Sequence, residues 1–544
     1  WAHKIPVDNV RLLERMEEID KGVVFKDDSP MTINQQLQTK ILIMCYADLA
    51  CLDIEDLPTA KVAPMRINTH KHPPIKLKMR PTPIRAREWL KEHIDDLLKG
   101  KVIVPVGDSP YGFPLVFASK RDEKFRLCID FRELNVVTIV NQGPIPLLQD
   151  MINNVYKKKF CANIDLTKAY FQLPLAPEDF EKTTFICELG SFMFLKVPFG
   201  LAGAVAHYQT VLRDLIAKIE LTAVQSIANY IDDVFIGGEE FEDFLDALEK
   251  LFEQMRNTNL KFGLKKSAFG VREVKYLGFV ANADTWYPDP ERIKPLLDRP
   301  PPRDLKELRG ICSSLAFYKR FLPNSTHILE ALFEKLRGLD AKYSKKSRKP
   351  ISIPSDQAIA DAWEDCKKLL QNKIMNWHID PFKEFHLFVD ASDYASGSAI
   401  MQYIGEEGNS DLRPVAFHSK VFNPAERNYT TTERELLGVL HALDKYNYII
   451  IGGEYVNIYT DHKSIIALVA SKTVTTQRLC RWRRWLSTYK LRWKYIPGKE
   501  HELADFLSRP PEQVYKKMQY YIEKPASEES FEYDERFPKM HMCR

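Results

Sequence analysis

Two adjacent aspartates, Asp232 and Asp233, interrupt an apolar stretch, ANYIDDVFIGG, at residues 228–238. An ionised carboxylate is costly to bury unless it is paired or bound to a metal, so the stretch is not one continuous buried strand. The apolar residues on either side predict two short strands joined by a tight turn that carries both aspartates. Aspartate also favours turns through local hydrogen bonds, so this stretch alone leaves two interpretations open, turn chemistry and a metal site.

A third carboxylate, Asp165, ends a short apolar strand in the stretch CANIDLTKAYFQLPL. A two-metal site needs two or three carboxylates that converge on two cations roughly 4 Å apart. One aspartate at a strand end and two more on a hairpin could supply such a set, and oxygen ligands of this kind suit Mg²⁺. The three aspartates therefore predict a site that activates a hydroxyl and stabilises a leaving phosphate oxygen.

The length of the chain, 544 residues, exceeds one hydrophobic core and predicts two to four domains. A net charge of +4 is too small to indicate a nucleic-acid partner unless the basic residues cluster locally. Nine cysteines without a C-x-x-C pair, and no signal peptide, predict a reduced, intracellular protein. No apolar run reaches the ~18 residues of a membrane span. Because the first residue is Trp1, we expect the sequence to be a piece of a longer protein.

The order of patterns along the chain predicts an α+β protein with several domains. Helical spacing occurs within residues 1–60, and an extended, basic, proline-rich segment covers 61–83. We then expect a helix that ends at Gly100, a hairpin over 113–134, short strands over 160–200, a helix over 240–257 and a single strand, VKYLGFVA, over 274–281. Prolines near residues 287–302 mark a boundary, after which helices, a basic linker and a second β-rich unit follow.

The second β-rich unit contains four more acids, each of which, taken alone, would more often be a helix cap or a surface charge. Asp390 ends an apolar strand that is followed by a predicted Gly-containing turn and another strand, and Asp461 ends a later strand. Glu435 lies on a helix, with Glu433 as its nearest rival, and Asp505 lies on a last helix. Two strand ends and two helices can bring four carboxylates to one edge of a sheet. This layout predicts a second two-metal site, with water as the nucleophile.

Several motifs, taken together and in order, resemble the reverse transcriptases of Gypsy-type LTR retrotransposons that carry a C-terminal RNase H domain. They are IDLTKAYFQLPL, the Tyr-x-Asp-Asp hairpin, FRLCIDFRELN, VPFGLAGAVAHYQ, KYLGFV and LRGICSSLAFYKRFLPN, followed by the four acids of the second unit. The resemblance covers roughly residues 65–510. It implies a right-hand polymerase (fingers, palm and thumb) followed by an α/β RNase H-like domain. The implied domains are an N-terminal extension (1–64), fingers and palm (65–285), thumb and linker (286–380), RNase H (381–510) and a tail (511–544).

The resemblance also implies roles for individual residues. The polymerase metal ligands would be Asp165, Asp232 and Asp233, and the RNase H metal ligands would be Asp390, Glu435, Asp461 and Asp505. Tyr170 matches the aromatic gate that selects deoxynucleotides, although a core role for Tyr170 or Phe171 is the alternative. Lys120 and Arg126 match the residues that hold the incoming triphosphate. Lys265 or Lys266 is a candidate for a general acid near the phosphates.

Three further features bear on the resemblance. Val205 stands where the family has proline, and LKKSAF lacks the cysteine of the family, which puts template positioning in doubt. In QRLCRWRRWLSTYKLRWKY, Arg481, Arg483 and Arg484 could contact phosphates, and Trp482 and Trp485 could either stack or belong to the core.

The implied function is RNA- and DNA-dependent DNA synthesis, with cleavage of the RNA strand of an RNA/DNA hybrid. It would require two Mg²⁺ ions per site, with Mn²⁺ as a substitute. The implied partners are an RNA template, a DNA primer, the hybrid and deoxynucleoside triphosphates, with homodimerisation open, no membrane, and a cytoplasmic location inside virus-like particles. The alternative is a domesticated, catalytically silent nucleic-acid-binding protein, which the presence of all seven acids disfavours.

Overall fold

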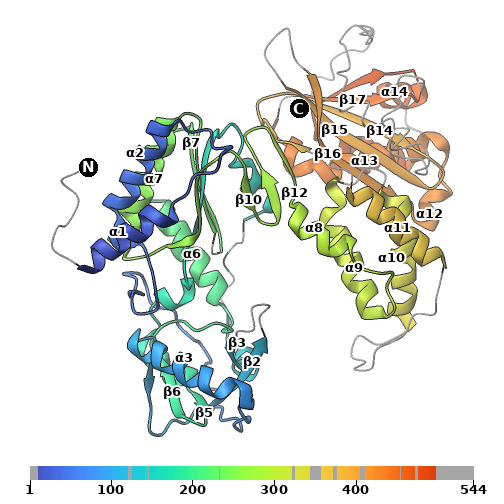
Figure 1. The fold of residues 1–544 in the computed structure, drawn as a ribbon. Coiled ribbons are helices and arrows are strands. Elements are labelled where there is room, and N and C mark those ends of the chain that lie inside the picture. Colours follow the sequence, from blue (N-terminus) through green and yellow to red (C-terminus); the bar gives the residue numbers. More distant parts are fainter. Residues whose placement is uncertain are drawn as a thin grey trace. The chain divides into compact units, whose positions relative to one another are not determined.

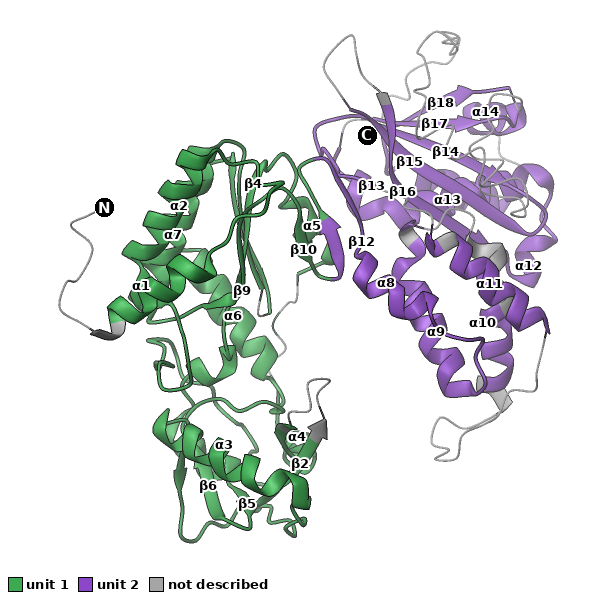
Figure 2. Ribbon diagram, in the orientation of Figure 1, with its two compact units in different colours: residues 1–277, 281–283 green, residues 278–280, 284–544 purple. Residues whose placement is uncertain are grey.

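The computed structural model describes residues 10–119, 125–140, 143, 146–231, 233–321, 325–342, 357–371, 376–404, 411–453, 455–471 and 476–497 (Figure 1). The chain forms two compact units (Figure 2). Unit 1 comprises residues 1–277 and 281–283, and unit 2 comprises residues 278–280 and 284–544. Among the described helices, none combines the length and the apolar composition that crossing a lipid bilayer requires.

The central sheet of unit 1 contains the hairpin that the aspartate pair predicts. Its strand order is β7-β8-β4-β9, with the bounds β7 Gln225–Tyr230, β8 Asp233–Gly238, β4 Phe160–Asp165 and β9 Gly263–Val271. β8 pairs antiparallel with both β7 and β4. Helices α6 (Ala204–Ile216) and α7 (Phe241–Thr258) pack against β7 and against each other. These helices therefore cover one face of the sheet.

Helix α7 is the helix predicted over 240–257, and its sequence explains both its burial and its ends. Phe244, Leu248 and Met255 recur at helical spacing and are buried against the sheet. A capping box at Glu240 satisfies backbone groups at the N-terminus. The helix ends at Asn259, which adopts a left-handed conformation with φ +58°.

A second sheet of unit 1 contains the predicted hairpin over 113–134. The strand order is β1-β6-β5-β2-β3, with the bounds β1 Ile103–Pro105, β6 Gly190–Phe194, β5 Phe185–Cys187, β2 Phe113–Ser119 and β3 Phe125–Ile129. The antiparallel register of β2 and β3 pairs Leu115 with Ile129 and Ala118 with Arg126. The predicted helix ending at Gly100 is α3, Arg87–Lys99. Shorter elements of unit 1 are α4 Arg132–Val137, α5 Leu148–Asn153, β10 Val274–Tyr276 and the 3-10 helices η2 Ala47–Leu49, η3 Ile84–Ala86, η4 Ala169–Gln172, η5 Pro177–Asp179 and η6 Glu181–Thr183.

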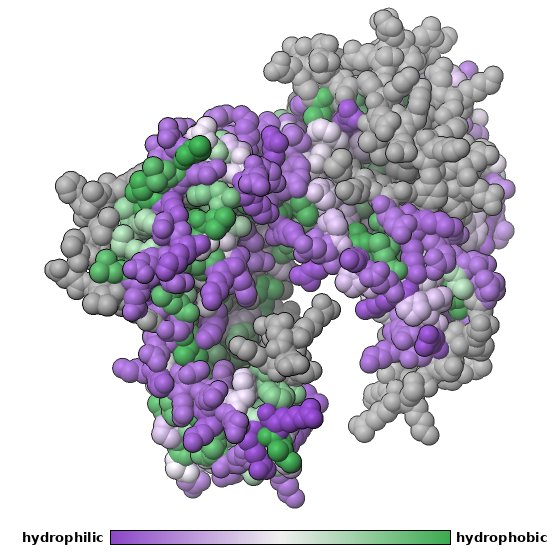
Figure 3. All heavy atoms as spheres, viewed as in Figure 1, coloured by the Kyte–Doolittle hydropathy of each residue, from purple (hydrophilic) through white to green (hydrophobic). Residues whose placement is uncertain are grey.

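Helices α1 (Val10–Gly22) and α2 (Ile33–Cys45) pack into the core of unit 1, although their sequences carry no chemical motif. Tyr46, directly after α2, is fully buried, and the guanidinium of Arg256 stacks on its ring while pairing with Asp48. The two helices also expose apolar side chains, and Figure 3 shows hydrophobic patches over this part of unit 1. The exposed apolar residues of this region are Leu13, Val24, Ile33, Leu37 and Ile41.

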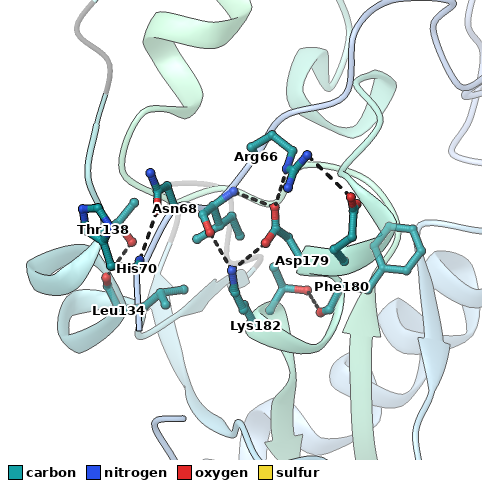
Figure 4. Close-up of polar contacts among 11 residues, drawn as sticks. Arg66, Asn68, His70, Leu134, Thr138, Asp179, Phe180 and Lys182 are labelled. Carbon is teal, nitrogen blue, oxygen red and sulfur yellow. Dashed lines mark hydrogen bonds and ion pairs between the residues drawn. The ribbon is translucent and has the colours of Figure 1, made fainter. Parts of the chain in front are cut away.

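The basic segment over 61–83 is extended, as predicted, and one buried carboxylate anchors it (Figure 4). Asp179 accepts hydrogen bonds from the Ile67 N–H at 2.8 Å and from Lys182 Nζ at 2.6 Å. Lys182 Nζ also donates to the Ile67 carbonyl at 2.7 Å, and Arg66 Nε lies 3.5 Å from the Asp179 carboxylate. Buried and exposed side chains alternate over residues 65–70, as in an extended chain, and Met65 forms an isolated bridge with Leu175.

Unit 2 begins with the helices predicted after the proline-rich boundary. They are α8 Pro290–Leu297, α9 Leu305–Tyr318, η7 Lys319–Phe321, α10 Ser325–Lys342 and α11 Gln357–Gln371. The aromatic rings of Phe279, Trp286 and Phe321 pack together, and the ring centroids of Trp286 and Phe321 lie 4.6 Å apart. Short strands β11 (Phe279–Ala281), β12 (Thr285–Pro288) and β13 (Asn376–Trp377) accompany them.

The prediction of one continuous strand for VKYLGFVA is wrong. Leu277 and Gly278 adopt φ values of +57° and +85°, and they separate β10 from β11. Glycine tolerates this left-handed conformation, but leucine gives no turn signal in a sequence. The apolar run therefore concealed the turn.

The second sheet predicted from the sequence lies in unit 2 with the order β16-β15-β14-β17-β18. The bounds are β16 Asp411–Val421, β15 Ala395–Ile404, β14 Phe385–Ala391, β17 Val456–Thr460 and β18 Leu491–Tyr495. β14 runs parallel to β17 and antiparallel to β15. Helix α13 (Thr431–Ile450) packs on β14 and β15, and the remaining helices are α12 Pro424–Arg427, α14 Lys463–Ala470 and α15 Gln477–Leu486.

The prediction of a Gly-containing turn after Asp390 is also wrong. The turn consists of residues 392–394, and Ser392 Oγ accepts hydrogen bonds from the N–H groups of Tyr394 and Ala395. Gly397 lies inside β15, where it is the direct partner of Asp390. The serine hydroxyl thus makes the turn that the sequence pattern assigned to glycine.

Candidate active sites

In unit 1 the strand register brings two of the three predicted polymerase aspartates together. Asp233 is the direct cross-strand partner of Asp165 on β4 and of Tyr230 on β7. Directly paired residues project their side chains to the same face of a sheet. Asp165, Asp233 and Tyr230 therefore share a face at one end of the central sheet. Asp232 lies outside the described residues.

The main chain at Asp165 is fixed by the neighbouring strand β9. Ser267 Oγ accepts a hydrogen bond from the Asp165 N–H at 3.1 Å and donates one to the Gly263 carbonyl at 2.7 Å. A Cβ at Gly263 would lie 1.8 Å from Thr167 Oγ1, so only glycine fits beside the strand end. Of the two lysines considered from the sequence, Lys266 reaches the site, with its Nζ 3.5 Å from the Asp165 carboxylate.

Tyr170 lies on η4 and is buried in an aromatic cluster close in sequence to Asp165. Its ring packs edge-on against Phe199 at 5.1 Å and tilts against Tyr208 at 5.5 Å. Phe171 is also buried and contacts Phe199, which is half-exposed. This packing is compatible with both a gate and a core role, so the role of Tyr170 stays a prediction.

Of the two predicted triphosphate-binding residues, one has a described backbone position, in the β2–β3 hairpin. Lys120 is outside the described residues, and the backbone of Arg126 lies in β3 opposite Ala118. Their contact with a nucleotide stays a prediction.

A cluster of one acid and two arginines near this hairpin was missed from the sequence. Asp130 accepts two hydrogen bonds from Arg132 and one from Arg80, each at 2.7 Å. The hydrogen bonds from Arg132 lower the pKa of Asp130 to about 2. Both guanidinium groups are largely exposed, so the cluster presents positive charge on the surface. The Asp-x-Arg spacing in IDFRE was the signal for Arg132, whereas Arg80 lies 50 residues away.

In unit 2 three predicted RNase H acids converge. Oxygen atoms of Asp390, Glu435 and Asp461 all lie within 4.8 Å of one another. β14 and β17 are parallel with Phe388 opposite Tyr459, so Asp390 and Asp461 emerge at the same end of the sheet. Asp505 lies outside the described residues.

Helix α13 brings Glu435 to this cluster. Gly438, one turn later, allows the close approach, because a Cβ there would lie 3.2 Å from Ser396 Cβ and 3.3 Å from a Val389 methyl group. Burial, reinforced by the charges of Asp390 and Asp461, raises the pKa of Glu435 to about 9. A cation among these oxygens would relieve the repulsion, and a set of carboxylates alone suits Mg²⁺.

Glu433, the rival of Glu435, is engaged elsewhere. Its side chain closes a capping box with Thr430 at the start of α13 and pairs with Arg478 at 3.2 Å. Arg478 also stacks over the ring of Tyr429 at 3.9 Å. The structure thus places Glu435, and not Glu433, with the two aspartates.

Helix α15 separates its tryptophans from its arginines. Trp482 and Trp485 are half-buried and pack against the hydrophobic core that contains Leu479 and Leu486. Arg481 and Arg484 lie on the exposed side of the helix. This helix therefore presents a basic face to solvent.

Two family models match the chain, one for each candidate site. A model described as "Reverse transcriptase (RNA-dependent DNA polymerase)" matches residues 118–281, which include Asp165 and Asp233. A model described as "RNase H-like domain found in reverse transcriptase" matches residues 380–489, which include Asp390, Glu435 and Asp461.

The chain is also similar to transposon polyproteins. It is 30% identical over 84% of its length to the retrovirus-related Pol polyprotein from transposon opus, and 29% identical over 84% to that from transposon gypsy, both of Drosophila melanogaster. A Tf2-3 transposon polyprotein of Schizosaccharomyces pombe is 25% identical over 79% of the chain. The chain spans 45%, 43% and 31% of these three relatives, respectively.

Solved structures of foamy viral protease-reverse transcriptase share the fold. One, in complex with double-stranded DNA, has a TM-score of 0.76 at 21% identity and covers 90% of this chain and 83% of its own. Another, in complex with an RNA/DNA hybrid, has a TM-score of 0.71 at 21% identity and covers 93% of this chain and 66% of its own. These likenesses confirm the predicted α+β architecture of a right-hand polymerase followed by an RNase H-like domain. The chain therefore contains a reverse transcriptase domain followed by an RNase H-like domain of the kind found in reverse transcriptases, and it is similar to the Pol polyproteins of the opus and gypsy transposons.

Proposed function

We propose that unit 1 synthesises DNA on an RNA or a DNA template and that unit 2 cuts the RNA strand of the resulting hybrid. The observation that carries the proposal is the convergence of carboxylates in both matched domains. Asp165 faces Asp233 across two strands in unit 1, and Asp390, Glu435 and Asp461 cluster in unit 2.

Each of the two sites would hold its own metal ions through its own carboxylates. Asp165, Asp232 and Asp233 would hold divalent cations in unit 1, and Asp390, Glu435, Asp461 and Asp505 would hold them in unit 2. Bound Mg²⁺ supplies Lewis-acid activation of the attacking oxygen and charge stabilisation at the leaving oxygen. The carboxylates fix where that chemistry occurs, because strand pairing and the packing of α13 set their positions.

The surfaces around these sites support nucleic-acid partners. The foamy viral relatives were solved with double-stranded DNA and with an RNA/DNA hybrid, which are the substrates proposed here. The exposed arginines of α15, and Arg80 and Arg132 near β3, offer phosphate contacts that carry little sequence information. In the proposal Lys120 and Arg126 hold the triphosphate, and Tyr170 contacts the sugar.

The test is primer extension on an RNA template with Mg²⁺ and deoxynucleoside triphosphates, with a label on the RNA so that cleavage is measured in the same tube. We expect extension and cleavage with Mg²⁺, and neither in excess chelator. Binding of the primer–template without either reaction, across metals and salt concentrations, would overturn the proposal in favour of a catalytically silent binding protein.

A further inference from the structure

The turn that carries the aspartate pair is strained. Ile231, directly before Asp232, adopts φ +53°. A β-branched residue in this conformation is a clear outlier, and it stores backbone strain. A strained turn keeps its shape only where the surrounding structure holds it, so the contacts of Ile231 identify what holds this one.

One side chain, Gln209 of α6, holds the main chain on both sides of Tyr230. Its Oε1 accepts a hydrogen bond from the Ile231 N–H at 2.9 Å, and its Nε2 donates one to the Asn229 carbonyl at 3.2 Å. Gln209 is buried, with 5% of its surface exposed. A single orientation of the Gln209 amide makes both hydrogen bonds, one through its acceptor oxygen and one through its donor nitrogen. We call this pair of hydrogen bonds the clamp.

The residues that Gln209 holds lie next to the predicted metal-binding acids. Tyr230, between the two clamped groups, is the cross-strand partner of Asp233, and Asp233 is the partner of Asp165. Tyr208, the neighbour of Gln209 on α6, packs against the ring of Tyr170. One turn of α6 therefore contacts both the aspartate hairpin and the predicted nucleotide gate.

We propose that Gln209 is a positioning residue for DNA synthesis, which holds the strained turn at Ile231 so that Asp233 faces Asp165. The inference rests on the proposed polymerase activity of unit 1. Its effect should be confined to synthesis, because small displacements of reacting groups cost rate while binding of the primer–template uses other surfaces.

Two variants of Gln209 separate the bonds of the clamp. Gln209→Met keeps the size of the side chain and removes both hydrogen bonds, whereas Gln209→Glu keeps the acceptor for the Ile231 N–H and loses the donor. The matched control is Gln225→Met, which removes a second buried glutamine at the opposite end of β7, where Gln225 bonds to Asp246 and to the Asp243 carbonyl.

The measurements are kcat and KM for deoxynucleotide incorporation, the Mg²⁺ concentration at half-maximal rate, and hybrid cleavage by the same preparations. We expect Gln209→Met to lower kcat by roughly 100-fold and to raise the Mg²⁺ requirement several-fold, with a smaller change in nucleotide KM. Gln209→Glu should fall between this variant and the wild type. Gln225→Met should synthesise DNA at close to the wild-type rate, and hybrid cleavage should be unchanged in all three variants.

A second-site variant distinguishes positioning from general damage. Asparagine adopts positive φ far more readily than isoleucine, so Ile231→Asn should restore part of the kcat lost in Gln209→Met. The inference is overturned if Gln209→Met synthesises DNA with wild-type kcat and Mg²⁺ requirement, if Gln225→Met loses as much, or if Ile231→Asn restores nothing. A wild-type chain that extends no primer would instead refute the proposed function itself.

Discussion

Burial and two neighbouring carboxylates shift the pKa of Glu435 far above its ordinary value. With its pKa raised to about 9, the folded protein holds a proton on Glu435 that the unfolded chain releases near the ordinary glutamate value. Without a divalent cation, the contribution of Glu435 to the stability of unit 2 is therefore fully present below that ordinary value and is lost as the pH rises toward 9.

Removal of one neighbouring charge should reverse this effect. We predict that, without metal and at pH 8, Asp390→Asn raises the unfolding temperature and increases the free energy of unfolding by about 1 kcal/mol or more. Hybrid cleavage should fall at least ~100-fold. Added Mg²⁺ should stabilise the wild type and leave the variant unchanged. Calorimetry with and without Mg²⁺ measures this, with Asp444→Asn on the exposed side of α13 as the control. A metal-free Asp390→Asn that unfolds at a lower temperature than the wild type would contradict the account.

The sequence predicted the acids themselves but not the residues that position them. A short apolar run lies beside each of the acids Asp165, Asp233, Asp390 and Asp461, and this local pattern can be read from the sequence alone. Gln209 and Ile231 are separated by 22 residues in the sequence, and the packing of helix α6 against strand β7 brings them into contact. Such partnerships depend on tertiary packing, and no local pattern marks them.

Among the elements, the extended segment over 61–83 is held at Ile67 by the buried carboxylate of Asp179. Asp179→Ala would leave Lys182 and the Ile67 N–H without their buried partner, and we predict a loss of about 2–4 kcal/mol in the stability of unit 1. Glu178→Ala is the control, because Glu178 is exposed and lies 3.5 Å from Arg66, so it should change stability by less than about 0.5 kcal/mol. Urea unfolding of both variants measures the difference, and equal losses would show that Asp179 does not anchor the segment.

The elements that were predicted correctly are those with long, regular patterns. Helix α7 and the β2–β3 hairpin show apolar periodicity over many residues, which outweighs any single position. The two wrong predictions concern turns of two or three residues. At Leu277 the backbone takes a left-handed conformation in a leucine, and after Asp390 a serine hydroxyl replaces the expected glycine. Turns made in these ways leave no compositional signal.

At the scale of the whole molecule, burial keeps three histidines neutral among the described residues of unit 2. Burial, reinforced by nearby lysines, lowers the pKa to about 4 for His386, about 3 for His418 and about 4 for His441. Each contributes stability that is fully present above the unfolded value near 6.5 and is lost as the pH falls toward the folded value.

We therefore predict that unit 2 loses stability between pH 7 and pH 4, with each histidine contributing on the order of 2–3 kcal/mol. His386→Phe should reduce this dependence, although it also removes the hydrogen bond between His386 Nδ1 and Tyr459 Oη at 2.8 Å. Unfolding of the full chain at several pH values, followed through proteolytic peptides of unit 2, gives the slope. A slope in His386→Phe as steep as in the wild type would contradict the role of this histidine.

The central claim is that the two units hold two separate carboxylate sites with two separate reactions. The most direct test compares Asp233→Asn and Asp390→Asn with the wild type in one assay that records primer extension and cleavage of the labelled RNA template together. We predict that Asp233→Asn loses extension and still cuts a preformed RNA/DNA hybrid, and that Asp390→Asn extends the primer and leaves the RNA intact. Loss of both reactions from either single substitution would contradict the account.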